Sequence, residues 1–355
     1  MTKLIADGDL AAAVDECIYK YFERHICDAV ELDPSYQTLW QALYELIQSG
    51  GKRLRPQIVL IAYAAFGGKD TESMLPVAAA QELLHFSLLI HDDVIDRDYT
   101  RYNTLNIAGR YKELYAKFLT TEADQVHFAH STAILAGDLM LSGAHELIAQ
   151  SNLGANQKAT AQRLLSRSVF EVAGGELLDT ELSFVPYTNG DALKVARYKT
   201  ASYSFTAPLL TGALIAGCTD REAALLEDFA VALGTAYQLV DDVLGTFGDE
   251  KTTGKSTTSD ITEGKRTYLI EQTLNGLSAA EKRRFDTSFG MQHATESDIQ
   301  YVKQLIISTG AKEKTERMIS DYAHKAHSAL AKLKLNEEQH KEFTDLIASV
   351  TERTY

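Results

Sequence analysis

The chain has 355 residues but only five prolines and three cysteines. Because proline interrupts helix interiors, so few prolines in so long a chain favour long helices. The cysteines, Cys17, Cys27 and Cys218, show neither metal-ligand spacing nor a disulfide framework. Cys218 follows an apolar run and is predicted to be a small buried side chain. We expect a reduced, cytoplasmic protein without thiolate metal sites.

Positive charge is also scarce, since the chain has 35 lysines and arginines but 49 aspartates and glutamates, which gives a net charge of −14. A nucleic-acid surface needs a basic stripe, so we expect no nucleic-acid partner. The first residues, MTKLIADGDL, contain no signal-peptide core. No apolar run approaches the roughly 20 residues of a membrane span, so we expect no transmembrane segment.

Apolar residues recur at spacings of three and four almost everywhere, which predicts helices. The main predicted helices cover residues 10–22, 39–47, 76–96, 164–182, 192–217 and 222–247. Alternating strand-like segments are nearly absent, and no long linker or fixed repeat interrupts the pattern. We therefore expect an all-α helical bundle in one domain over residues 1–355. Its core motifs should lie at about 50–265 and its surface helices at about 280–355.

Carboxylates gather at the end of one apolar segment, LLIHDDVIDRD at residues 88–98. In a helix, Asp92 and Asp96 lie one turn apart on the same face, with Asp93 beside them. Such carboxylates repel one another unless a cation binds, and oxygen ligands suit Mg²⁺. The helix dipole also disfavours anions at a helix C-terminus. A solvated helix end is the alternative interpretation.

A second apolar segment ends in the same way, with Asp241 and Asp242 in YQLVDDVLGTFGD. If the two helices faced each other, they would form a carboxylate-lined mouth over an apolar pocket. Mg²⁺ ions there would bind a diphosphate and offset the negative charge. Four basic motifs could grip the phosphates, namely GGKRLRP at residues 50–56, RYKT at 197–200, TTGKS at 252–256 and EGKRT at 263–267.

Together these motifs resemble the trans-isoprenyl diphosphate synthases, the head-to-tail prenyltransferases. The landmarks occur in order over residues 50–265: GGKRxRP, ELxH before DDxxD, G-[QE]-x-x-D as GELLD, KT, and QxxDD before GDxxxTGK. No single motif is decisive, but the ordered set is a strong match. The resemblance implies an isoprenoid synthase fold, all helical around a deep central apolar cavity, and usually a homodimer.

The resemblance also implies roles for individual residues. It assigns isopentenyl diphosphate to Lys52, Arg55 and His85. It assigns the allylic diphosphate to Arg101, Lys199, Thr200, Gln238 and Lys255, and we add Lys265 as a further substrate-binding residue. It implies that Mg²⁺ is held by Asp92, Asp96 and Asp241, with Asp93 and Asp242 in support. These five aspartates and Lys199 are the expected catalytic residues.

The implied reaction is a condensation that depends on about three Mg²⁺ ions with the bound diphosphate. The allylic diphosphate ionises because metal ions and cationic side chains take up the departing charge. The apolar pocket shields the allylic cation from water. The alkene of isopentenyl diphosphate then attacks, and loss of a proton gives an all-trans product.

Product length depends on the side chains that precede the first aspartate cluster. Leu88, Ser87 and Leu84 lie four, five and eight residues before Asp92 and are predicted to point into the cavity. Ser87 is small, Leu88 narrows the passage and Leu84 is the expected floor. We expect a product of about twenty carbons or longer, with farnesyl diphosphate as the alternative. If Ser87 faces a neighbouring helix instead, the floor should be sought at Phe170 and Val172.

Rival all-α interpretations use other residues. A ferritin-like di-iron protein would use two Glu-x-x-His pairs, Glu82 with His85 and Glu337 with His340. A terpene cyclase should carry an Asn/Ser/Glu metal triad where this chain has its second aspartate pair. A non-catalytic partner subunit should have lost aspartates or arginines, and this chain keeps most of them.

Two positions depart from the family pattern. The usual RRG after the first cluster is RYN here, so Tyr102 stands where a second arginine is expected. The second cluster is DDVLG, so Gly245 replaces its third carboxylate. A phenol donates a hydrogen bond but carries no charge at neutral pH. We therefore expect weaker binding of isopentenyl diphosphate and a weaker second metal site.

Replacing Tyr102 by arginine should lower the Michaelis constant for isopentenyl diphosphate, because the guanidinium adds a charge-assisted hydrogen bond to the diphosphate. Steady-state kinetics at a saturating allylic substrate measures this constant. An unchanged or higher constant would mean that another cation, such as Arg110, already fills the role.

Overall fold

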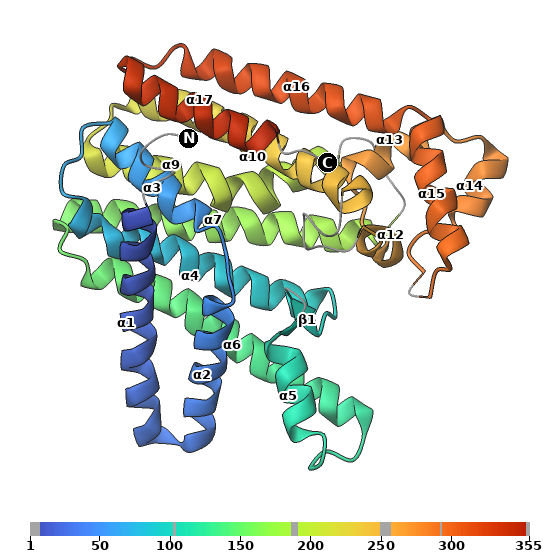
Figure 1. The fold of residues 1–355 in the computed structure, drawn as a ribbon, viewed down its shortest axis with the longest axis horizontal. Helices are drawn as coiled ribbons and strands as arrows, with labels where there is room; N and C mark the ends of the chain where they lie inside the picture. Colours follow the sequence, from blue (N-terminus) through green and yellow to red (C-terminus); the bar gives the residue numbers. More distant parts are fainter. Residues whose placement is uncertain (1–7, 102–103, 186–190, 249–256, 292, 353–355) are drawn as a thin grey trace. The chain divides into compact units, whose positions relative to one another are not determined.

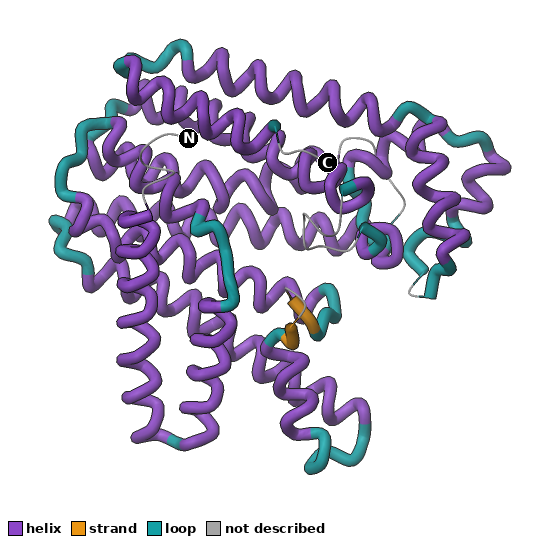
Figure 2. The backbone as a smooth tube through the Cα atoms, in the orientation of Figure 1, coloured by secondary structure: helices purple, strands orange, loops and turns teal. Residues whose placement is uncertain are grey.

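The computed structural model describes residues 8–101, 104–185, 191–248, 257–291 and 293–352 (Figure 1). Over these ranges the chain is helical almost throughout, and the expected all-α class is confirmed (Figure 2). The described strands are β1 (Thr100–Arg101) and β2 (Thr104–Leu105), which pair antiparallel.

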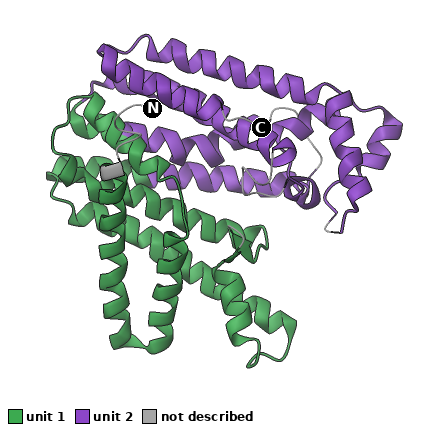
Figure 3. Ribbon diagram, in the orientation of Figure 1, with its two compact units in different colours: residues 1, 3–165, 211–217 green, residues 2, 166–210, 218–355 purple. Residues whose placement is uncertain are grey.

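The described residues form two compact units (Figure 3). Unit 1 holds residues 8–165 and 211–217, and unit 2 holds 166–210 and 218–352. The helices of unit 1 are α1 (Gly8–Leu32), α2 (Pro34–Gln48), α3 (Leu54–Ala65), α4 (Thr71–Ile95), α5 (Ile107–Tyr115) and α6 (Glu122–Gln150). Helices α7 (Ala155–Leu182) and α9 (Ala207–Ala216) each contribute to both units.

Unit 2 continues with a series of helices of very different length. These are α8 (Asp191–Val195), the π-helix η1 (Ala196–Thr206), α10 (Asp220–Phe247), α12 (Ser259–Glu263), α13 (Tyr268–Gly276), α14 (Ala279–Phe285), α15 (Glu296–Ser308), α16 (Ala311–Leu330) and α17 (Glu337–Thr351). The segment 192–217 was expected as one helix, but η1 interrupts it. Because π-turns are rare and often accompany functional sites, the position of the RYKT motif on η1 is informative.

Each unit is organised around one long apolar helix. In unit 1, α4 packs against α1, α3 and α6. In unit 2, α10 packs against η1, α16 and α17. Gly234 permits the close approach to η1, because a Cβ there would lie 2.5 Å from the Cβ of Ala201. Both aspartate clusters therefore end helices that are fixed by core packing.

The same two helices, α4 and α10, are long and apolar enough by length and composition to cross a membrane. Neither helix was identified as a candidate from the sequence, because a span tolerates a few charged residues that interrupt an apolar run. Of the most apolar window, 67% is buried in α4 and 56% in α10. Buried core helices pass the same test, so the finding is weak evidence for a span.

A buried guanidinium connects the helices of unit 1. Arg53, at the start of α3, is 5% exposed. Its Nε donates to Oδ1 of Asp15 on α1 at 2.7 Å, and its Nη2 donates to the carbonyl oxygen of Ile47 on α2 at 2.8 Å. Its Nη1 donates to Oε1 of Glu82 on α4 at 3.2 Å and to the carbonyl oxygen of Gly50 at 3.3 Å. One side chain thus links four helices.

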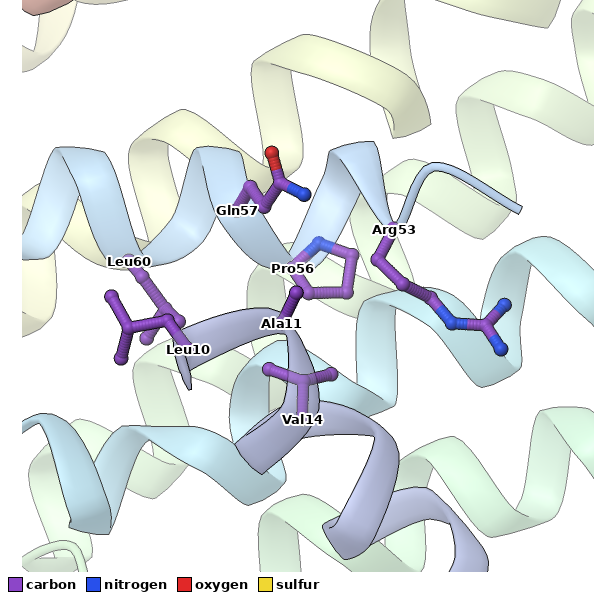
Figure 4. Close-up of a pocket in the computed structure, with 7 residues that line it drawn as sticks. All are labelled: Leu10, Ala11, Val14, Arg53, Pro56, Gln57 and Leu60. Atoms are coloured by element: carbon purple, nitrogen blue, oxygen red, sulfur yellow. The ribbon is translucent and has the colours of Figure 1, made fainter. Parts of the chain in front are cut away.

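A small pocket lies beside this residue, where α1 crosses the start of α3 (Figure 4). It measures about 10 Å³ and is lined mainly by apolar side chains, including Leu10, Val14 and Leu60. The Arg53 guanidinium points away from this lining. The pocket has room for roughly one water molecule and is too small for a prenyl chain.

Replacing Arg53 by methionine should lower the free energy of unfolding by about 3–5 kcal/mol, because the buried Glu82 carboxylate would lose its ion pair and hydrogen bond with Arg53. Urea unfolding measures the change. The double variant Arg53→Met/Glu82→Met is the control and should recover much of the loss, because it removes both charges. Equal destabilisation of the single and double variants would show that the ion pair is not the cause.

Candidate active site

The first aspartate cluster lies where α4 ends. The backbone N–H of Asp96, which caps the helix, donates to the carbonyl oxygen of Asp92 at 2.8 Å. Both side chains are half-buried and lie one turn apart. Asp93 is buried, and its Oδ1 accepts from Nε and Nη2 of Arg101 at 3.0 and 2.6 Å. Burial raises the pKa of Asp93 to about 6, although Arg101 opposes this shift.

Arginines surround His85 in the same unit. Burial lowers the pKa of His85 well below its ordinary value, and the guanidiniums of Arg55, Arg101 and Arg53 lower it further. The imidazole is therefore neutral at pH 7 and can still donate a hydrogen bond. Arg55 is buried, whereas Lys52 is exposed. Unit 1 thus brings Arg55, Arg101 and His85 into one positively charged region.

The arginine between the two expected phosphate-binding residues behaves differently. The sequence placed Lys52, Arg53 and Arg55 together in a turn suited to phosphate. The guanidinium of Arg53 is instead directed inward to Asp15 and Glu82, so it is a structural residue. Its backbone adopts a left-handed conformation, with φ of 47°, at the turn that separates Lys52 from Arg55.

In unit 2, Lys199 of η1 is held by two carboxylates of α7. Its Nζ lies 2.8 Å from Oε2 of Glu176 and 2.6 Å from Oδ2 of Asp179. Gly175 makes this possible, because a Cβ there would lie 2.2 Å from the backbone nitrogen of Lys199. Glu176 and Asp179 belong to the GELLD motif, but no role was predicted for either of them from the sequence. Their i,i+3 spacing on one helix face was the signal that could have identified them.

Further polar side chains in unit 2 form a chain of hydrogen bonds. The Thr200 hydroxyl donates to Oε1 of Gln238 at 2.5 Å, and Nε2 of Gln238 donates to Oδ1 of Asp242 at 2.7 Å. Burial raises the pKa of Asp242 well above its ordinary value, and the charges of Asp260 and Asp241 raise it further. The hydrogen bond from Gln238 opposes this shift. The network fixes the orientation of the Gln238 amide.

Of the remaining predicted residues, Asp241 and Lys265 lie within the described ranges. Asp241 is half-buried near the end of α10. Lys265 follows α12, and its Nζ lies 3.0 Å from Oε2 of Glu263. Lys255 and Tyr102 lie outside the described residues.

The expected chain-length residues belong to α4. Leu84 and Ser87 are buried, and Leu88 is half-buried. In unit 2, Phe170 is 82% exposed and Val172 is buried. These burial states leave the product-length assignment a prediction.

The carboxylates at the end of α4 suit a metal ion that also binds a substrate. Within the described ranges no three His, Cys, Asp or Glu side chains form a ready-made metal site. Mg²⁺ is usually held by one or two carboxylates together with waters and substrate phosphates. Asp92 and Asp96, one turn apart, provide such a pair. The residues therefore fit an ion that binds together with a diphosphate.

The di-iron interpretation needs a different arrangement. Glu82 is already paired with Arg53, and His85 faces arginines. Glu337 and His340 are both exposed on α17. The Glu-x-x-His pairs are thus not favoured as iron ligands.

Comparison with known proteins gives a consistent result. A family model described as polyprenyl synthetase matches residues 36–306. The chain is 34% identical to a geranylgeranyl diphosphate synthase of Sulfolobus acidocaldarius over 287 residues, which cover 79% of this chain and 81% of the relative. It is 28% identical to a geranylfarnesyl diphosphate synthase of Aeropyrum pernix, with 92% and 96% of the two chains covered.

A solved structure is also similar to this chain. It is a geranylgeranyl pyrophosphate synthase from Corynebacterium glutamicum complexed with isoprenyl diphosphate and magnesium. The TM-score is 0.88 and the identity 30%, with 96% of this chain and 99% of that chain covered.

Proposed function

This chain belongs to the polyprenyl synthetase family and is a trans-prenyltransferase, and we propose that it condenses isopentenyl diphosphate head to tail with an allylic diphosphate. The observation that carries the proposal is the family match over residues 36–306, which includes every charged motif described above. The charged networks of the two units supply the groups that such a reaction needs.

We assign the diphosphate of isopentenyl diphosphate to Lys52, Arg55 and His85. The guanidiniums of Arg55 and Arg101 act on His85 and attract the diphosphate, and the neutral imidazole donates a hydrogen bond without itself carrying charge. Arg53 is not assigned to the substrate, because its guanidinium nitrogens already donate to groups within the protein. The arginine cluster is thus prepared for an anion before the substrate arrives.

We assign the allylic diphosphate to Arg101, Lys199, Thr200, Gln238 and Lys255, with Lys265 as a further contact. Glu176 and Asp179 restrict the Lys199 ammonium to one position, which lowers the entropy lost on binding. Asp242 fixes the Gln238 amide in the same way. Asp93 fixes Arg101. Preorganised donors of this kind stabilise charge that develops on a leaving group.

We assign Mg²⁺ to Asp92, Asp96 and Asp241. When bound, it would neutralise charge on the departing diphosphate. Asp93 accepts hydrogen bonds from Arg101, and Asp242 accepts one from Gln238. They act as supports for Arg101 and Gln238.

The product has about twenty carbons or more, in line with the relatives named geranylgeranyl and geranylfarnesyl diphosphate synthase. We assign its length to Leu84, Ser87 and Leu88 of α4.

The proposal extends to the number of metal ions, the assembly of the protein and its location in the cell. We infer about three Mg²⁺ ions per bound diphosphate. We also infer a cytoplasmic homodimer that acts as one functional domain, and the family match spans parts of both units. Exposed apolar side chains on α6, Ile134 and Leu135, support a subunit interface there. Light scattering would measure the assembled mass.

Replacing Asp92 or Asp241 by asparagine should lower turnover by about 10²–10³-fold, the scale for loss of one charge-stabilising group. EDTA should abolish activity and Mg²⁺ should restore it. Turnover is measured with isopentenyl diphosphate and each allylic starter. The matched controls are the exposed Asp28→Asn in unit 1 and Asp286→Asn in unit 2, which should keep normal turnover. Near-normal turnover of either Asp92→Asn or Asp241→Asn at saturating Mg²⁺ would contradict the proposal.

Replacing Ser87 by phenylalanine should shorten the product towards fifteen carbons, because the ring would block the passage of the chain. Leu84→Ala should lengthen the product by removing the floor. Chromatography of dephosphorylated products measures chain length. If both variants are active and keep the parent product, the floor lies on another helix, and Phe170 and Val172 become the residues to test.

A further inference from the structure

The second aspartate cluster has a gap where the first has a carboxylate. In α4, Asp92 is followed one turn later by Asp96. In α10, Asp241 is followed one turn later by Gly245, which has no side chain. A cluster that relied on α10 alone would therefore present one carboxylate fewer on this face.

A carboxylate from another helix occupies this gap. A Cβ built on Gly245 would lie 2.7 Å from Oδ2 and 3.6 Å from Cγ of Asp260, which lies on α12. Helices α10 and α12 are in contact. The Asp260 carboxylate thus stands where a side chain at position 245 would begin.

Helix α12 is short, but its position is fixed by several contacts. The Ile261 side chain is 1% exposed and lies in a core cluster with Phe285 and Phe289. The backbone N–H of Gly290 donates to the carbonyl oxygen of Ile261 at 2.9 Å. The backbone N–H of Lys265 donates to the carbonyl oxygen of Asp260 at 2.9 Å. The backbone that carries Asp260 is therefore held on both sides.

Two glycines complete this attachment. Gly264 ends α12 with φ of 77°, and a Cβ there would lie 2.9 Å from the Cα of Gly290. Gly290 itself has φ of 72°. The two backbones can approach because Gly264 has no side chain, and the positive φ of Gly290 also favours glycine there. This approach holds α12 against the loop after α14 and so helps to place Asp260 beside α10.

We propose that Asp260 supplies the carboxylate that Gly245 lacks, so that Asp241 of α10 and Asp260 of α12 together hold the Mg²⁺–diphosphate in unit 2. The inference rests on the proposed function. Mg²⁺ accepts carboxylates from any direction that allows octahedral geometry, so the two need not come from one helix. The departure at Gly245 is then a relocation of the carboxylate and not a loss.

The test moves the carboxylate back to α10. Calorimetry measures the binding of inorganic diphosphate as a function of Mg²⁺ concentration, in the full-length protein. Asp260→Asn should weaken this binding roughly tenfold or more. Gly245→Asp alone should also weaken it, because the new side chain collides with Asp260. Gly245→Asp/Asp260→Ala should restore binding to within a few-fold of the parent, since it again has two carboxylates. The control Asp286→Asn should bind normally.

The outcomes separate the inference from the proposed function. A parent protein that neither binds diphosphate with Mg²⁺ nor makes prenyl diphosphates would overturn the proposed function. A parent that does both, with an Asp260→Asn variant of unchanged Mg²⁺ dependence, would overturn only the role of Asp260. If circular dichroism shows that Asp260→Asn does not fold, the double variant Gly245→Asp/Asp260→Ala decides the question. Binding by Gly245→Asp/Asp260→Ala as weak as that of Gly245→Asp alone would refute the relocation, and recovery towards the parent would support it.

Discussion

The buried guanidinium of Arg53 is the interaction on which the arrangement of unit 1 depends. Burying a charge is costly unless every donor finds a partner, and here two carboxylates and two carbonyl oxygens accept from it. These partners fix the start of α3 and the middle of α4 relative to α1 and α2. The same commitment prevents Arg53 from binding substrate. The turn therefore leaves Lys52 exposed and Arg55 beside His85.

Unit 2 applies the same principle to residues that we assign to the substrate. Lys199 lies between two carboxylates, and Gln238 lies between a donor and an acceptor. Each side chain is thus oriented before a ligand arrives, which reduces the reorganisation needed during ionisation. The π-helix η1 and Gly175 bring the backbone of Lys199 close enough to α7 for this arrangement.

Motif comparison along the chain gives an incomplete account of the second aspartate cluster. By sequence, Gly245 is a missing carboxylate and the metal site should be weaker. In space, Asp260 approaches the same position from a helix that begins fourteen residues further along the chain. Counting residues within one helix misses such a replacement, because a metal ion responds to the positions of oxygen atoms and not to their order in sequence.

The sequence by itself determined the all-α class, the long helices α4 and α10 and the positions of both aspartate pairs at their ends. These features follow from helical periodicity, which depends on residues three or four apart. Only the tertiary structure decided the inward direction of Arg53, the partners of Lys199, the π-helical form of residues 196–206 and the approach of Asp260 to Gly245. Each of these depends on contacts between segments distant in sequence, where burial and the need to pair polar groups outweigh local preference.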